Sequence, residues 1–203
     1  MIVGIVKYGV GNIGSIVNAF KKLGIETLIV ESCDKLNDCD VVILPGVGSF
    51  DAAMSYIKSR LPCIIDLKGS KPILGICLGL QIMFECSDEG TSKGLSWYSG
   101  RVRLLKSRVI PHMGWNSVKI IRKTDLTKDL PEEPYFYFAH SYCIYSNDVD
   151  ESIKLGITTF EDSEFLSILF DEKNLILGTQ FHPERSSKNG LKLLKNFIDL
   201  CRR

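Results

Sequence analysis

The chain has 203 residues, 45% of them hydrophobic, and its 25 basic residues nearly balance 24 acidic ones, giving a formal net charge of +1. A chain of this length can bury one substantial core, and no composition shift indicates a linker, so we expect residues 1–203 to form a single domain. The balanced charge gives no electrostatic reason to expect binding to nucleic acid or to a membrane surface.

The cysteine count and the amino terminus indicate a cellular compartment. Seven cysteines are present, an odd number, and none forms a Cys-x-x-Cys pair. We therefore expect free thiols in a reducing, cytoplasmic environment, with neither a disulfide framework nor a zinc site. Residues 1–6 predict a strand and not a signal peptide, because they lack a basic flank and a long apolar stretch. No segment approaches the ~20 apolar residues of a membrane span.

The first half of the chain alternates short apolar runs with helical patterns. Strands are expected over 2–6, 26–30, 41–44 and 73–76, and helices over 13–23, 51–67 and 78–85. This βαβ order predicts an α/β fold with a parallel sheet covered by helices on both faces.

The second half lacks long helices until its end. Strands are expected over 117–121, 135–139, 152–158, 167–171 and 175–181, and these should add antiparallel strands to a mixed, mostly parallel sheet. The last helix carries an apolar stripe for core packing, formed by Leu191, Leu194, Phe197, Ile198 and Cys201.

A turn directly after the 73–76 strand places a cysteine between two glycines, Gly75-Ile-Cys77-Leu-Gly79. This is the pattern of a nucleophile elbow with sulfur as nucleophile. The glycines allow the strand and the following helix to approach closely around a strained turn that exposes the Cys77 side chain to a substrate. The helix start should favour the thiolate. The alternative is a buried cysteine acting as a small hydrophobe.

A histidine and a carboxylate follow the last predicted strand, in the run Gln180-Phe-His182-Pro-Glu184. Pro183 should keep His182 out of helical geometry, and the i, i+2 spacing of an extended segment turns His182 and Glu184 to the same side. A histidine that takes the thiol proton, with a carboxylate that fixes its tautomer, completes a nucleophilic triad. The alternative is a structural histidine at a strand end.

The glycine-rich turn Pro45-Gly-Val-Gly48-Ser-Phe50 follows the 41–44 strand. In an elbow enzyme, the amide after the nucleophile, here Leu78, and an amide from a neighbouring loop form an oxyanion hole. We expect the second donor in the 46–48 turn, with Gly48 as the candidate. By itself this turn is weak evidence, because Pro-Gly turns commonly follow strands.

These motifs resemble those of the class I (triad) glutamine amidotransferases. The runs Tyr8-Gly-Val-Gly-Asn12, Pro111-His-Met-Gly-Trp-Asn116 and Tyr137-Phe-Ala-His-Ser-Tyr142 further resemble the glutaminase subunits of imidazole glycerol phosphate synthase, across nearly the whole chain. The resemblance implies the α/β fold of the family and glutamine hydrolysis without a cofactor or metal. It also implies a glutamine site that includes Gln81, Glu89, Ser141 and Tyr142.

The same resemblance implies a partner. A separate (β/α)₈ cyclase subunit would form a heterodimer with this chain and receive ammonia through a tunnel. The residues implied at this interface are Asn12, Trp115, Tyr137 and Arg185. Departures from the family pattern at Lys7, 94–100 and 158–162 leave two ammonia acceptors open, a ribonucleotide of histidine biosynthesis and a surface sugar that a related partner amidinates.

Three other functions compete with this interpretation. Gly9-Val-Gly-Asn-Ile-Gly14, with Glu31 after the next strand, satisfies the dinucleotide fingerprint of an NAD-binding oxidoreductase. Against it, Lys7 and Tyr8 separate the strand from the first glycine, and the catalytic triad would have no purpose. A cysteine peptidase of the same fold and a silent binding module are the others, but a silent module should have lost a triad member.

Overall fold

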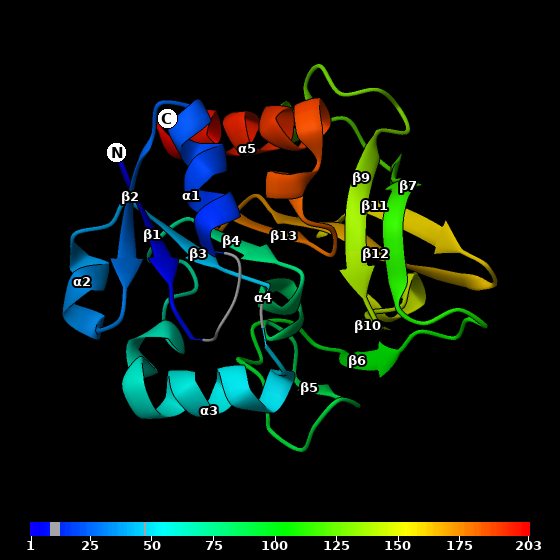
Figure 1. Ribbon diagram of the computed structural model, residues 1–203, viewed down its shortest axis with the longest axis horizontal. Coiled ribbons are helices and arrows are strands. Elements are labelled where there is room, and N and C mark those ends of the chain that lie inside the picture. Colours follow the sequence, from blue (N-terminus) through cyan, green and yellow to red (C-terminus); the bar gives the residue numbers. More distant parts are fainter. Residues whose placement is uncertain (9–12, 47) are drawn as a thin grey trace.

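A computed structural model describes residues 1–8, 13–46 and 48–203 (Figure 1). Its centre is an eight-stranded sheet with the strand order β2-β1-β3-β4-β13-β12-β11-β8. The first five strands in this order run parallel to one another, and each of the remaining three pairs antiparallel with the strand before it. The predicted α/β fold with a mixed, mostly parallel sheet is therefore confirmed.

The parallel half of the sheet consists of short, almost entirely apolar strands. They are β1 (Ile2–Val6), β2 (Glu26–Val30), β3 (Val41–Leu44), β4 (Ile73–Ile76) and β13 (Ile176–Thr179). The first four have the predicted bounds. In β1, β3 and β4 the cause is burial, because strands buried on both faces are continuous apolar runs.

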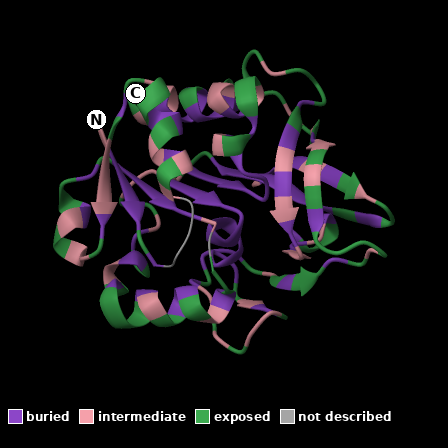
Figure 2. Cartoon of the chain, in the orientation of Figure 1, coloured by how far each residue is buried: buried purple, intermediate pink, exposed green. Residues whose placement is uncertain are grey.

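Helices cover both faces of the sheet, as predicted (Figure 1). α1 (Ile13–Lys22) and α5 (Ser187–Cys201) lie on one face, and α2 (Cys33–Asn37), α3 (Phe50–Arg60) and α4 (Leu78–Gln81) on the other. Each face has its own hydrophobic cluster. Figure 2 shows the buried strands at the centre and the exposed sides of the helices facing outward.

The antiparallel half differs in part from the prediction. β8 (Lys119–Ile120), β11 (Lys154–Phe160) and β12 (Ser163–Asp171) extend the main sheet. β7 (His112–Ser117) and β9 (Tyr135–His140) instead form a separate two-stranded ribbon. A third, small sheet holds β10 (Tyr142–Cys143), β6 (Arg101–Leu104) and β5 (Cys86–Ser87).

The single strand predicted over 117–121 is therefore wrong. Ser117 pairs with Tyr135 in the ribbon, whereas Lys119 pairs with Ile157 in the main sheet. The chain changes sheets at Val118, which is fully buried. The strand predicted over 135–139 is present, but it belongs to the ribbon.

Two predicted helices end early, and each end has a local cause. α3 stops at Arg60 because Leu61 precedes Pro62 and adopts a non-helical conformation, with φ −134° and ψ 49°. α4 stops at Gln81 because the carbonyl of Ile82 accepts a hydrogen bond from the amide of Leu95, at 2.7 Å. Short 3₁₀ turns complete the chain at η1 (Pro62–Ile64), η2 (Asp125–Thr127), η3 (Ser146–Asp148) and η4 (Pro183–Arg185).

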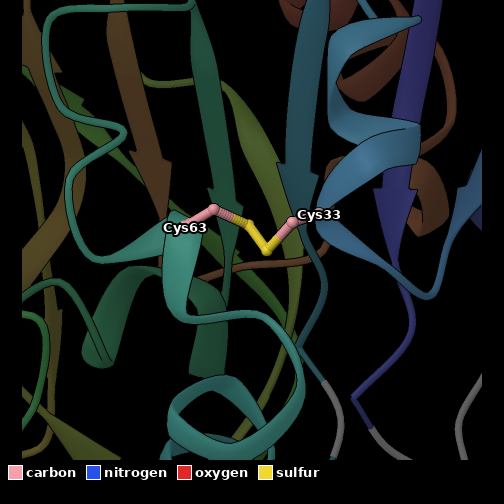
Figure 3. The surroundings of a disulfide bond; sticks show 2 residues. All are labelled: Cys33 and Cys63. Atoms are coloured by element: carbon pink, nitrogen blue, oxygen red, sulfur yellow. A yellow bond between two sulfur atoms is a disulfide. The ribbon is translucent and has the colours of Figure 1, made fainter.

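A disulfide joins Cys33 of α2 to Cys63 of η1 (Figure 3). The prediction of seven free thiols is therefore wrong, and the free cysteines are Cys39, Cys77, Cys86, Cys143 and Cys201. The fold brings the two Cα atoms to 6.0 Å across a sequence separation of 30 residues, a proximity that cysteine spacing does not reveal. The closed loop contains β3, the turn after it and α3.

Removing this cross-link should destabilise the protein. We expect the Cys33→Ser/Cys63→Ser double variant to lose about 3 to 4 kcal/mol of unfolding free energy, because opening a loop of this length increases the chain entropy of the unfolded state. That loss corresponds to a decrease in Tm of about 6 to 16 °C for a chain of this size. Cys86→Ser is the matched control. If thiol titration of the denatured, unreduced protein counts seven thiols, the disulfide does not form.

Candidate active site

The candidate site lies at the carboxyl ends of β3, β4 and β13. β4 and β13 are parallel neighbours, with Ile76 opposite Thr179. The amide of Cys77, the next residue after β4, donates to the Thr179 carbonyl at 2.6 Å. Pairing of two strands that are far apart in sequence therefore places Cys77 beside the segment that carries His182.

The Cys77 turn is strained and tightly packed, as predicted. Its φ of 49° and ψ of −106° put a non-glycine residue in a sparsely populated region. A Cβ on Gly79 would lie 1.9 Å from the carbonyl oxygen of Leu44, and one on Gly75 would lie 2.6 Å from that of Gly79. Both glycines are therefore required for the strand and the helix to approach this closely.

The Cys77 side chain is 7% exposed and lines a cavity of about 270 Å³. Gln180 donates from Nε2 to the sulfur at 3.5 Å, and the carbonyl of Ala139 lies 3.8 Å from it. α4 is a single turn of four residues, so its dipole supports a thiolate less than the longer predicted helix would. The contact with Gln180 was not predicted, although Gln180 belongs to the motif that contains His182.

His182 and Glu184 form a hydrogen-bonded pair, with Nδ1 of the histidine 2.9 Å from Oε1 of the glutamate. The predicted pairing is confirmed, but its local geometry differs. His182 is extended, and Glu184 lies in the 3₁₀ turn η4 that begins at Pro183. The histidine backbone is fixed by its amide, which donates to the Tyr137 carbonyl, and by its own carbonyl, which accepts from Ser186 Oγ at 2.6 Å.

The ionisation of His182 is set by opposing effects. Burial lowers its pKa, but hydrogen bonds and charge interactions with Cys77 and Glu184 outweigh burial and raise the pKa to about 10. Nδ1 is occupied by Glu184, so Nε2 is the nitrogen available to Cys77. The imidazole is therefore protonated at neutral pH and can donate a proton from Nε2.

The two candidate oxyanion donors, Gly48 and Leu78, line the same cavity as Cys77. A Cβ on Gly46 would lie 2.6 Å from Cys77 Cβ, so the backbone at Gly46 is in close contact with the elbow. Gly48 has a φ of +91°, which favours glycine. The buried hydroxyl of Tyr8 donates to the Pro45 carbonyl at the start of this loop. The role of the two amides remains a prediction.

The four predicted glutamine-binding residues, Gln81, Glu89, Ser141 and Tyr142, also line this cavity. Gln81 Nε2 donates to the Tyr142 carbonyl at 2.8 Å, and Glu89 accepts from the amide of Phe50 at 2.9 Å. Further lining residues that sequence reasoning missed are Pro111, Met113, Ala139 and His140.

Three of the four predicted interface residues lie together beside the site. Trp115 and Tyr137 are opposite each other in the ribbon, and the Arg185 guanidinium lies 4.3 Å from the centre of the Tyr137 ring. Trp115 is 53% exposed. Asn12 lies outside the described residues.

The dinucleotide fingerprint also falls largely outside the described residues, which exclude its first two glycines. Glu31, the acid that such a site would use, forms an exposed ion pair with Lys7 at 2.8 Å. Within 1–8, 13–46 and 48–203, no group of three histidine, cysteine or acidic side chains is arranged to hold a metal ion. The helices of the same residues include none long and apolar enough to cross a membrane.

The family model for class I glutamine amidotransferases matches residues 5–200. The chain belongs to this family. It is 38% identical to the imidazole glycerol phosphate synthase subunit HisH of Gloeothece citriformis, with 99% of this chain and 97% of the relative covered. It is 36% identical to the HisH subunit of Pyrobaculum aerophilum over the full length of both chains. The family assignment overrides the oxidoreductase alternative.

Solved structures support the fold. A glutamine amidotransferase matches with a TM-score of 0.76 at 17% identity, covering 99% of both chains. The PurLQS structure from Thermotoga maritima matches with a TM-score of 0.74 at 20% identity, covering 98% of this chain and 97% of the other.

The raised pKa of His182 predicts a pH profile. Glutaminase kcat at saturating glutamine should remain level from pH 7 to about 9 and fall as pH passes about 10, where the imidazolium is lost. Stabilisation from this pair follows the same sign: it is complete below about 6.5 and disappears through about 10. Glu184→Gln removes one of the groups that raise the pKa, so its alkaline limb should move to lower pH. An unmoved limb would contradict the assignment.

Proposed function

We propose that this chain is the glutaminase subunit of an imidazole glycerol phosphate synthase, which supplies ammonia to a separate (β/α)₈ cyclase subunit in histidine biosynthesis. The observation that carries the proposal is the interaction of His182 with both Cys77 and Glu184, with Cys77 lining the cavity. The chain that carries this triad matches HisH subunits over nearly their full length.

In the first step, Cys77 Sγ attacks the side-chain amide carbon of glutamine. The developing oxyanion accepts hydrogen bonds from the Leu78 amide and from the 45–49 loop, with Gly48 as the candidate donor. His182 donates its Nε2 proton to the departing nitrogen, so the C–N bond breaks, ammonia leaves and a thioester remains.

In the second step, water attacks the thioester carbon while His182 Nε2 takes a proton from it. The C–S bond breaks, glutamate leaves and the Cys77 thiolate is restored with protonated His182 beside it. Glu184 holds the imidazole in the tautomer and orientation that both steps need. Ammonia then passes to the partner.

The cavity suits a free amino acid. Its volume of about 270 Å³ is below the ~300 to 1,000 Å³ of sites for drug-sized ligands. The Glu89 carboxylate and the Gln81 side chain, with the backbone at 141–142, would hold the amino-acid end of glutamine. The side-chain amide would then reach Cys77.

The ribbon face beside the site fits a protein partner. Met113 is 65% exposed and Tyr135 is 58% exposed, and both lie on the strands that carry Trp115 and Tyr137. Exposed apolar and aromatic side chains in such a group indicate an interface. A barrel subunit docked here would receive ammonia beside His182 and could bias the 45–49 loop toward its active arrangement.

Cys77→Ala should abolish product formation from glutamine while leaving product formation from ammonium salts intact when the cyclase subunit is present. The substitution removes the nucleophile but little packing. Cys86→Ala, at a free cysteine outside the cavity, is the control. Glutaminase activity above a few per cent of wild type would rule out Cys77. Product from a surface-sugar acceptor alone would assign the chain to the amidinating relatives.

Arg185→Ala should weaken complex formation or partner-stimulated turnover by about 1 to 3 kcal/mol, because a guanidinium held over Tyr137 can pair bidentately with a partner carboxylate. Basal hydrolysis should change far less. Arg185→Lys keeps the charge but loses the planar fork, so it should be intermediate. Equal losses of basal and stimulated activity, with unchanged partner affinity, would place Arg185 in the glutamine site instead.

A further inference from the structure

Two of the three histidines have no part in the mechanism above. His112 on β7 and His140 on β9 are 3% and 5% exposed. Their rings are packed among aromatic side chains: the His112 ring is stacked on Phe138 and Phe160 at centroid distances of 4.7 and 4.0 Å. The nitrogens of a buried imidazole need hydrogen-bond partners, so the identity of these partners indicates the role of the ring.

The two rings belong to one chain of hydrogen bonds. His140 Nδ1 lies 2.9 Å from the Tyr142 carbonyl, and its Nε2 lies 3.0 Å from Nδ1 of His112. Nε2 of His112 lies 3.3 Å from the side-chain amide of Asn116. Every nitrogen of both imidazoles therefore has a partner.

Only one assignment of protons satisfies this chain. A carbonyl can only accept, so His140 Nδ1 must carry a proton and its Nε2 must accept. His112 Nδ1 must then donate to His140, and its Nε2 accepts from Asn116. Burial lowers the pKa of His112 to about 4, and burial together with His112 lowers that of His140 to about 3. Both rings are neutral, as the assignment requires.

This series of hydrogen bonds ends in the glutamine cavity. The Tyr142 carbonyl that accepts from His140 also accepts from Gln81 Nε2, at 2.8 Å. The same Gln81 amide lies 3.2 Å from Gln180 Oε1, and Gln180 donates to Cys77 Sγ. With its amide nitrogen occupied in this way, Gln81 presents Oε1 as its remaining polar atom.

We propose that His112 and His140 are positioning residues for glutamine: they fix the Tyr142 carbonyl, which in turn fixes the Gln81 side chain and the 141–142 backbone that would hold the amino-acid end of the substrate. This inference rests on the proposed glutaminase function. Neither ring is a catalytic residue, since neither takes part in the reacting bonds.

The test compares two substitutions at His112. His112→Asn keeps an N–H donor near the position of Nδ1, whereas His112→Leu removes it. Phe160→Leu is the matched control, because it disturbs the ring stacked on His112 without removing a hydrogen bond. Glutaminase kinetics are measured in the complex with the cyclase subunit.

We expect His112→Leu to raise KM for glutamine about tenfold with kcat within about twofold of wild type, as when uniform binding is lost. His112→Asn should stay within about threefold of wild type in KM, as should Phe160→Leu. Equal KM values for the Leu and Asn variants, or an equal rise in Phe160→Leu, would show that His112 serves packing alone.

A second measurement does not depend on activity. Imidazole ¹⁵N spectra of the full chain should show His112 and His140 as Nδ1–H tautomers that do not titrate between pH 5.5 and 9, and His112→Leu should leave the fold intact by amide spectra. Nε2–H tautomers would overturn the proposal. If the wild-type complex hydrolyses no glutamine while the Nδ1–H tautomers are present, the proposed function fails and the proposal for glutamine fails with it, whereas the hydrogen-bond chain stands.

Discussion

The site depends on backbone contact around Cys77 that leaves no room for side chains. Gly79 lies under the Leu44 carbonyl, and Gly46 lies against Cys77 itself. The end of β3, Gly46 and the elbow are therefore in direct backbone contact. Because interiors are close-packed, this contact links the nucleophile geometry to that of the candidate oxyanion loop.

Two further elements complete the cavity around this contact. Parallel pairing of β13 with β4 brings the His182 turn to the sulfur, and the ribbon supplies the opposite wall through the 139–142 segment. The ribbon alternates its faces: Met113 and Trp115 point outward, while His112 is buried. Because the exposed Met113 also lines the cavity, this short strand contributes both to the proposed partner surface and to the wall of the site.

The features that could be predicted are those encoded by a short, continuous stretch of sequence. The bounds of β1 to β4 were predicted to the residue because each strand is a short, mostly apolar run. Cys77 was recognised because the glycines on either side of it are required by close backbone packing. The Cys33–Cys63 bond was missed because it depends on where α2 and η1 pack. The early end of α4 at Gln81 was missed because its cause is distant in sequence: the amide of Leu95 donates to the Ile82 carbonyl. The bond between His140 and His112 carried no local signal, since strand register brings the two residues together.

The ionisation of the three histidines has a consequence for the whole molecule. Histidine usually makes a protein sensitive to small changes around neutral pH. Here His112 and His140 are neutral and His182 is charged, with pKa values far from 7 on either side. The histidines therefore take up or release almost no protons between about pH 5.5 and 8.5. The total charge on the three imidazoles stays constant when the surrounding pH changes within this range.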